Sequence, residues 1–406
     1  MKIGILTYYR VANFGANLQA VSTYCYLKNL GHTPIFIHYM PKELYEFTND
    51  NSNVQKRQHL SFIDNTMLDS QTTLIHDGTK IDGQIAEYGI EALIVGSDAL
   101  LQHHPLLERI KRGRIKPFYI QKINSDRMFP NAFWGCGMTA DIPMAMMSVS
   151  SQNSRYQLFS SLLKRRMKQA LSKFGYISVR DEWTRDLVYS ITKKEVPVTP
   201  DPVFAFNQNC RELLDNSENI RVKYGLPEKY ILVSLASQCL SLAQLEELKT
   251  YYEERDIYCV ALPMPTGLSF KHPFKYEIKT PLNPLDWYRL IRDSEAYIGS
   301  NMHPIVVSLH NGVPCFCIDQ WINTDFWGRP INDGSGKVEH ILKVFGVSNC
   351  RCNLENGKCS ASIQTIVGSL ETFPVSKVKM QAEKYYAAYR DMMCDILTYF
   401  NHENSI

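Results

Sequence analysis

The sequence lacks the features that mark several classes of protein. No apolar run reaches the roughly 18 residues that a membrane-spanning helix needs. The 44 Lys and Arg residues nearly balance the 41 Asp and Glu residues, and a net charge of +3 gives no general case for binding nucleic acid. There is no Walker A loop, no Gly-x-Gly-x-x-Gly after a strand and no nucleophile elbow around a serine. We therefore expect no nucleic-acid partner and none of the chemistries that these motifs support.

Secretion signals and metal-ligand spacings are also missing. Residues 1–6 lead directly into a β-type pattern, without the apolar region and cleavage site of a signal peptide. The eleven cysteines are scattered, and the cluster of Cys350, Cys352 and Cys359 lacks the paired Cys-x-x-Cys spacing of zinc sites. We expect a cytoplasmic protein with free thiols and no metal.

What is present is an ordinary globular composition in a long chain. Of the 406 residues, 45% are hydrophobic and 21% are charged, which excludes general disorder. The length suggests about two to three domains. Strand-like runs alternate with helical patterns in both halves, at residues 2–8, 33–38, 92–95, 144–149, 176–179, 230–235, 257–262, 296–298 and 314–318. This alternation predicts an α/β protein with two doubly wound Rossmann-like domains that face a cleft.

The domain boundaries follow from changes in composition. We predict an N-terminal α/β domain over residues 1–207 and a C-terminal α/β domain over residues 228–373. The polar residues between them form a linker in this prediction. Residues 374–406 carry an apolar stripe at helical spacing, which predicts a long helix that packs back on the N-terminal domain.

Ligands of open α/β sheets bind beyond the carboxyl ends of the strands, and those positions give the candidate site. The polar or flexible residues found there are Asn13, Gly15, Ser97, Asp98, Arg180, Asp201, Ser300, Asn301 and His303.

Arg180 and His303 are the most informative of these residues. Arg180 follows a strand and opens a helix, so its guanidinium and nearby N–H groups suit a carboxylate or a phosphate. The alternative is a surface ion pair with Asp181 or Glu182. His303 precedes Pro304, the expected first residue of a helix whose positive end would lower the histidine pKa until a dianion binds. Here the alternative is a capping or packing histidine.

The other positions have equally plain structural interpretations. Asp98 could cap a following helix, and Asn13 and Gly15 could serve only as turn residues. The chain also contains two basic segments. Segments of this kind are usually solvated, but these two could approach anionic lipid headgroups or a lipid-linked diphosphate at the inner face of a membrane. They comprise Arg109, Lys111, Arg112, Arg114 and Lys116, and then Lys164, Arg165, Arg166 and Lys168.

Short segments spread over residues 1–345 form a recognisable series. They are Ile3-Gly4-Ile5-Leu6-Thr7-Tyr8, Asn13-Phe14-Gly15-Ala16-Asn17-Leu18-Gln19-Ala20, Val95-Gly96-Ser97-Asp98, Ser178-Val179-Arg180-Asp181-Glu182, Asp201-Pro202, Gly299-Ser300-Asn301-Met302-His303 and Gly312-Val313-Pro314. In their order and spread they resemble the polysaccharide pyruvyl transferase family. The chain departs from the family at Pro304, where Gly is frequent, and at Ala99 and Leu100, where Gln and Trp are frequent.

The resemblance implies a glycosyltransferase-B-like fold, with the acceptor on the N-terminal domain and the donor on the C-terminal domain. It also implies transfer of the enolpyruvyl group of phosphoenolpyruvate to a sugar or lipid-linked glycan, as a cyclic pyruvate ketal of cell-surface glycans. Phosphoenolpyruvate is then a co-substrate, and no cofactor is expected. Arg180 matches the residue that holds the donor and His303 the proposed general acid, while Arg329 or Lys337 supplies a further cation. Asp98 or Asp201 is the candidate base.

Two other functions fit the same sequence. One is a nucleotide-sugar-dependent glycosyltransferase, which would release a nucleotide instead of phosphate. The other is a non-catalytic glycan-assembly protein, which would show no turnover.

Overall fold

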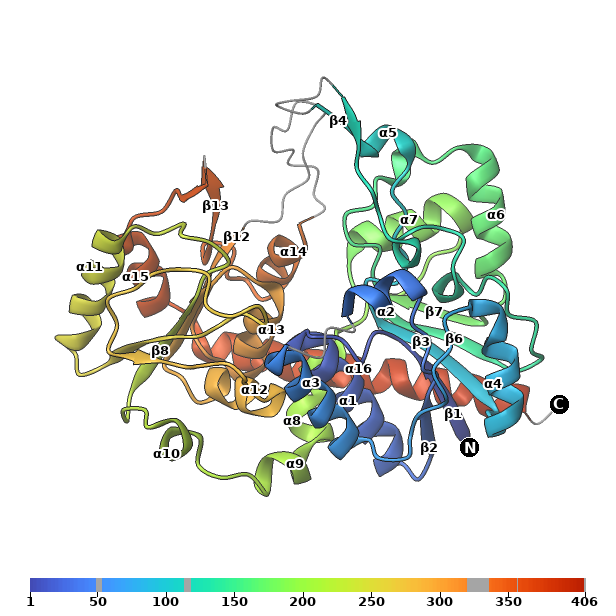
Figure 1. The fold of residues 1–406 in the computed structure, drawn as a ribbon, viewed down its shortest axis with the longest axis horizontal. Coiled ribbons are helices and arrows are strands. Elements are labelled where there is room, and N and C mark those ends of the chain that lie inside the picture. The colour runs from blue at the N-terminus through green and yellow to red at the C-terminus, as the bar shows by residue number, and fades with distance from the viewer. Residues whose placement is uncertain (49–52, 113–117, 320–335, 356, 405–406) are drawn as a thin grey trace.

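The computed structural model describes residues 1–48, 53–112, 118–319, 336–355 and 357–404. Two sheets organise the chain (Figure 1). The first sheet has the order β2-β1-β3-β6-β7, and all its strand pairs are parallel. Its strands are β1 (Lys2–Leu6), β2 (Thr33–Phe36), β3 (Ala92–Asp98), β6 (Met144–Val149) and β7 (Tyr176–Val179). The central strands are buried along most of their length, as expected for a parallel sheet covered on both faces.

The second sheet has the order β10-β9-β8-β11-β12-β13-β14, and only its last pair is antiparallel. Its strands are β8 (Tyr230–Ser234), β9 (Tyr258–Ala261), β10 (Tyr276–Glu277), β11 (Ala296–Gly299), β12 (Cys315–Asp319), β13 (Arg351–Glu355) and β14 (Lys358–Cys359). Each sheet is thus a Rossmann-like unit, as the alternating pattern predicts.

Helices connect the strands of both sheets. In the first half they are α1 (Phe14–Asn29), α2 (Lys42–Thr48), α3 (Val54–Thr66), α4 (Ile81–Tyr88), α5 (Leu106–Arg109), α6 (Ser161–Leu171) and α7 (Glu182–Thr192), with a small hairpin of β4 (Ile110–Lys111) and β5 (Tyr119–Ile120). Beyond these come α8 (Phe206–Asn209), α9 (Arg211–Asp215), α10 (Ile220–Tyr224), α11 (Leu242–Glu253), α12 (Pro284–Arg292), α13 (Met302–Asn311), α14 (Lys337–Val344), α15 (Ile363–Glu371) and α16 (Val375–Glu403). Short 3-10 turns cover Gly78–Lys80, Ser125–Arg127, Ala132–Trp134, Tyr156–Leu158 and Pro202–Ala205. No helix within the described ranges is both long and apolar enough to cross a membrane.

The last helix ties the two halves together. Figure 1 shows α16 running from the second half across the first, and its end lies near the N-terminus. Its Met392 sulfur accepts hydrogen bonds of 3.3 Å from the hydroxyls of Ser148 and Ser178, on strands β6 and β7. A side chain on Gly175 would meet the Tyr399 ring at 2.3 Å, so the helix lies close against the chain there. The helix thus packs on the first sheet.

Contacts between α1, α3 and α12 also join the halves. The ring of Phe14 stacks on Trp287 with centroids 4.9 Å apart. The Gln55 amide donates to the Leu282 carbonyl at 2.7 Å and accepts from the Leu282 N–H at 2.6 Å. These contacts fix the start of α1 against the second half, which matters for the site.

The segment between the two predicted domains is folded. Residues 208–227 are polar, yet the structure forms short helices there and buries Cys210, Leu214 and Ile220 in the core. Burial of these apolar side chains holds the segment against the core. The division into domains 1–207 and 228–373 stays a prediction.

Candidate active site

The start of α1 forms one wall of the site. Asn13 caps this helix, and its Oδ1 atom accepts a hydrogen bond of 3.2 Å from the Ala16 N–H. Gly15 lies in the first turn, directly against the ring of His303 from the other half. A Cβ atom on Gly15 would lie 2.0 Å from the His303 Cγ atom. Gly15 is therefore required for a close approach between the halves, in addition to its place in a turn.

The end of β3 forms the floor of the site. A Cβ atom on Gly96 would lie 2.1 Å from the Met147 carbonyl oxygen, so only glycine fits between the strands. The Ser97 hydroxyl donates to the Ser148 carbonyl at 2.8 Å, and the Ser97 carbonyl accepts from Thr7 at 2.6 Å. Ser97 thus holds the strand end, with its hydroxyl donating to the backbone of the neighbouring strand.

Asp98 follows at a backbone φ of 149°, which side-chain-bearing residues rarely adopt. Its Oδ1 atom accepts a hydrogen bond of 2.6 Å from the Ala99 N–H. The interpretation of Asp98 as a helix cap is wrong, because the next helix, α5, begins only at Leu106. A residue held in such a conformation at a strand end is typical of functional sites.

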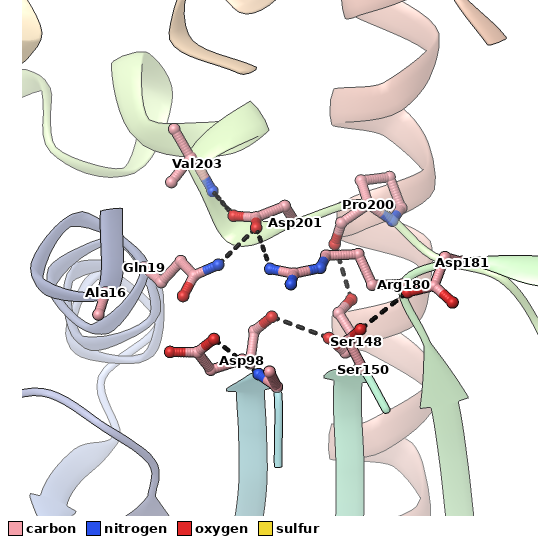
Figure 2. Close-up of polar contacts among 12 residues, drawn as sticks. Ala16, Gln19, Asp98, Ser148, Ser150, Arg180, Asp181, Pro200, Asp201 and Val203 are labelled. Carbon is pink, nitrogen blue, oxygen red and sulfur yellow. Dashed lines mark hydrogen bonds and ion pairs between the residues drawn. The ribbon is translucent and has the colours of Figure 1, made fainter. Parts of the chain in front are cut away.

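Arg180 reaches into the space between Asp98 and Asp201, as Figure 2 shows. The side chain is buried, and its Nη1 atom donates to Asp201 Oδ2 at 2.8 Å. The predicted alternative, a surface pair with Asp181 or Glu182, is wrong: Asp181 caps α7 by accepting from the Thr184 N–H at 2.7 Å. Burial lowers the pKa of Arg180, but the charges of the neighbouring aspartates outweigh it and raise that pKa overall.

The Nε atom of Arg180 is buried and has no hydrogen-bond partner within the described residues. A buried cationic donor without a partner is costly, since desolvation is not repaid. An anion bound beside Arg180 would satisfy this atom.

The Asp201 carboxylate accepts hydrogen bonds from three different parts of the chain. Its carboxylate is 1% exposed and accepts from Arg180, from the Gln19 amide of α1 and from the Val203 N–H, the last at 3.0 Å (Figure 2). With both oxygens engaged, this carboxylate is poorly suited to removing a proton. Of the two predicted bases, Asp98 is therefore the better candidate.

The second half contributes the start of α13. The helix begins at Met302, two residues before the predicted start at Pro304, so His303 is its second residue. Asn301 precedes the helix without capping it, and its amide lies 3.2 Å from the Met264 sulfur. The buried Ser300 hydroxyl accepts from the Ala236 N–H at 3.4 Å. Both residues shape the turn that presents His303.

His303 Nε2 is buried and has no hydrogen-bond partner in the part of the chain that the structure describes. Burial lowers the pKa of His303, the positive charges of Arg180 and Lys337 lower it further, and Asp201 and Asp98 oppose them. The imidazole is thus neutral near pH 7 in the empty site, and a bound dianion would favour its protonated form.

Lys337 is the first residue of α14. Burial lowers the pKa of Lys337 to about 8. The positive charge of Arg180 lowers this pKa as well, and the negative charges of Asp181, Asp98 and Asp201 oppose the shift. These interactions place the Lys337 ammonium in the same cluster of charges as Arg180 and His303. The other predicted cation, Arg329, lies outside the described residues.

Two residues of the site were not predicted. The Gln19 amide, on α1, donates a hydrogen bond to Asp201. Gln19 lies about two turns after Asn13, the cap of the same helix, and that position could have indicated a place in the site. Arg351 donates to Asp319 at 3.1 Å and to Glu339 at 3.0 Å, so it fixes the start of α14 against strand β12. No local pattern around Arg351 reveals that role, because its partners are distant in the sequence.

The arrangement as a whole suits an anion that must receive a proton. A guanidinium, an ammonium and the first turn of α13 converge on one place. Beside them lies an imidazole with one nitrogen that no described residue contacts by a hydrogen bond. The described residues contain no group of three or more His, Cys, Asp or Glu side chains placed to hold a metal ion.

Comparisons with known proteins agree with this architecture. The structure of UDP-GlcNAc 2-epimerase from Neisseria meningitidis bound to UDP-GlcNAc is similar to this one. The match covers 98% of this chain and 100% of that chain, with 12% sequence identity and a TM-score of 0.52. UDP-N-acetylglucosamine 2-epimerase from Rickettsia bellii is similar over 99% of this chain and 97% of its own, with 10% identity and a TM-score of 0.51. At such low identity the likeness shows the fold alone, and it confirms the predicted pair of Rossmann-like domains.

A search of curated proteins by sequence finds no match. A sequence model described as "Polysaccharide pyruvyl transferase" matches residues 13–321, which include every candidate residue from Asn13 to His303. The chain belongs to the polysaccharide pyruvyl transferase family.

Proposed function

We propose that this protein transfers the enolpyruvyl group of phosphoenolpyruvate to two hydroxyls of a sugar and forms a cyclic pyruvate ketal of a cell-surface glycan. One observation carries the proposal: Arg180, Lys337 and His303 share one cluster of charges, and His303 Nε2 has no partner among the described residues. A carboxylate and a phosphate on one small molecule match two cations, and its enol carbon needs the proton that a histidine can give.

The cations hold the donor. Arg180 can bind a carboxylate or a phosphate at two points because its guanidinium is planar, and Asp201 fixes its orientation. Lys337 and the N–H groups at the start of α13 add positive charge for the second anionic group. The bound dianion then raises the pKa of His303, so the imidazole becomes charged only when the donor is present.

The reaction balances with these groups alone. His303 gives its proton to the methylene carbon, which becomes a methyl group, and one sugar hydroxyl attacks the adjacent carbon. The bond between that carbon and the bridging oxygen breaks, and phosphate leaves with the oxygen. A second hydroxyl closes the ring. Asp98, on the N-terminal half, accepts the proton of one hydroxyl, and the released phosphate takes the proton of the other. The proton on Asp98 then returns to His303, so both groups end the cycle as they began it.

The test is to incubate the protein with phosphoenolpyruvate and a panel of sugars and lipid-linked sugars, and to measure phosphate release. Acceptor-dependent phosphate supports the proposal. Release of nucleotide from UDP-sugars, with no phosphate from phosphoenolpyruvate, would favour a glycosyltransferase instead. No turnover of either donor would favour a non-catalytic assembly protein.

Donor affinity should fall above about pH 8, where the free Lys337 loses its proton. Binding an anion favours the charged amine, so above that pH the donor must bind together with a proton. The donor KM should rise by up to about tenfold per pH unit. In Lys337→Arg the charge persists, and the rise should disappear, whereas Lys343→Arg on the same helix should behave like the natural protein. A rise that persists unchanged in Lys337→Arg would contradict this role.

Replacing Gly15 by alanine should lower kcat by about tenfold or more, because the new methyl group would displace the His303 ring. Helical content should not change, since alanine is favoured in helices. Gly368→Ala in α15 is the matched control, because nothing lies within 4 Å of its added Cβ atom. The two variants are compared by steady-state kinetics and circular dichroism. Normal activity in Gly15→Ala would show that the close approach of Gly15 to the His303 ring is not needed for catalysis.

A further inference from the structure

One segment of the N-terminal half exposes several large apolar side chains together. Leu106 and Leu107 of α5 are 55% and 70% exposed. Phe118, just before strand β5, and Tyr119 and Ile120 of that strand are 47 to 62% exposed. Single exposed apolar residues are ordinary, but five of them within one short paired segment indicate a surface that binds something.

The segment is held in shape without a core of its own. Strands β4 and β5 pair antiparallel, with Ile110 opposite Ile120, and the Arg109 Nε atom donates to the Gln121 carbonyl at 2.8 Å. These two strands form a separate sheet, and Figure 1 shows β4 and α5 projecting from the N-terminal half. A two-stranded hairpin has too little apolar surface to cover itself.

The charge of the segment is positive. Arg109, Lys111, Arg112 and Lys122 lie in or beside the hairpin, against one acidic residue, Glu108. The Glu108 carboxylate is itself paired with His104, whose Nδ1 atom lies 3.0 Å away. The surface therefore combines exposed apolar side chains with basic ones, a combination that complements anionic lipid at a bilayer interface.

The segment also lies on the side of the sheet that carries the site. It begins within ten residues of Asp98, at the carboxyl end of β3, and Figure 1 shows it on the same side of the molecule as α14.

We propose that α5 and the described parts of the hairpin, residues 105–112 and 118–122, dock on a membrane surface that contains anionic phospholipid. Leu106, Leu107 and Ile120 enter the boundary between headgroups and acyl chains, and Lys111, Arg112 and Lys122 contact lipid phosphates. Docking requires neither donor nor acceptor, so it stands apart from the proposed function. It would bring the site beside a membrane, where acceptors carried on lipids are found.

The experiment is sedimentation of the full chain with vesicles of phosphatidylcholine alone or mixed with phosphatidylglycerol, without phosphoenolpyruvate or sugar. The natural protein should bind the mixed vesicles, and added salt should weaken the binding. Leu106→Ser/Leu107→Ser/Ile120→Ser and, separately, Lys111→Glu/Arg112→Glu/Lys122→Glu should each weaken it by at least about tenfold. Val222→Ser/Met380→Ser removes exposed apolar side chains elsewhere and should change nothing.

Thermal unfolding of each variant is measured to check that its fold is intact. Equal binding of neutral and anionic vesicles, or no binding, would overturn the proposal. So would a concentration-dependent dimer in solution that the serine variant abolishes, because the surface would then contact protein. Since no substrate is present in this experiment, none of these results bears on the test of pyruvyl transfer.

Discussion

A His303→Gln enzyme is expected to lose kcat by about 100-fold or more, with donor KM little changed. Glutamine keeps much of the size and one hydrogen-bonding group, but it carries no proton to give to the enol carbon. The loss should therefore appear in the chemical step. Steady-state kinetics of phosphate release, with donor and acceptor varied in turn, separates the two constants.

The matched control for this variant is His310→Gln, two turns further along α13. His310 is buried and accepts from the Asn207 N–H, away from the cluster of charges. Its replacement should lower the melting temperature and leave kcat of the folded enzyme near normal. A His303→Gln enzyme with near-normal kcat would sink the acid assignment, whatever the behaviour of Arg180.

Arg180→Lys is the second change with a large expected effect. The lysine keeps the charge beside Asp201 but loses the planar, two-point contact, so donor KM should rise by about tenfold or more. Acceptor KM should change less. Arg185→Lys, a partly exposed residue on α7 paired with Asp186, should leave both constants unchanged. A rise in acceptor KM alone would indicate that Arg180 binds the acceptor and not the donor.

The two substitutions should combine non-additively. Both groups act on one bound molecule, so the double variant should lose less than the product of the separate losses in kcat/KM. Independent effects would indicate that Arg180 and His303 serve different ligands.

Much of the fold could be predicted because its strands are short, apolar and bounded by polar residues. Strands β6 and β7 match their predicted ranges, since buried parallel strands depend on local composition. Residues 41–90 are polar and irregular in pattern, so their sequence predicts no firm element, yet α3 lies there. Its sequence is polar, and it is held by tertiary contacts such as Gln55 with Leu282, which no window of sequence can reveal.

The candidate site was predictable to a similar extent. Positions at strand ends brought Asp98, Arg180 and His303 into one list, and the structure places them in one cluster of charges. The sequence could not choose between Arg329 and Lys337, and only the folded chain places Lys337 in that cluster. Nor could it reveal that Asp201 is fully engaged as an acceptor, because one of its donors, Gln19, is 182 residues away.

The central claim is that phosphate leaves by cleavage of the bond between carbon and the bridging oxygen. The direct measurement uses phosphoenolpyruvate labelled with ¹⁸O at that oxygen, together with an active acceptor, and follows the label by mass spectrometry. The proposed reaction predicts that the label appears in the released phosphate and that the glycan gains an unlabelled pyruvate ketal. Label found in free pyruvate, with unlabelled phosphate, would mean cleavage at phosphorus and would contradict the proposed transfer.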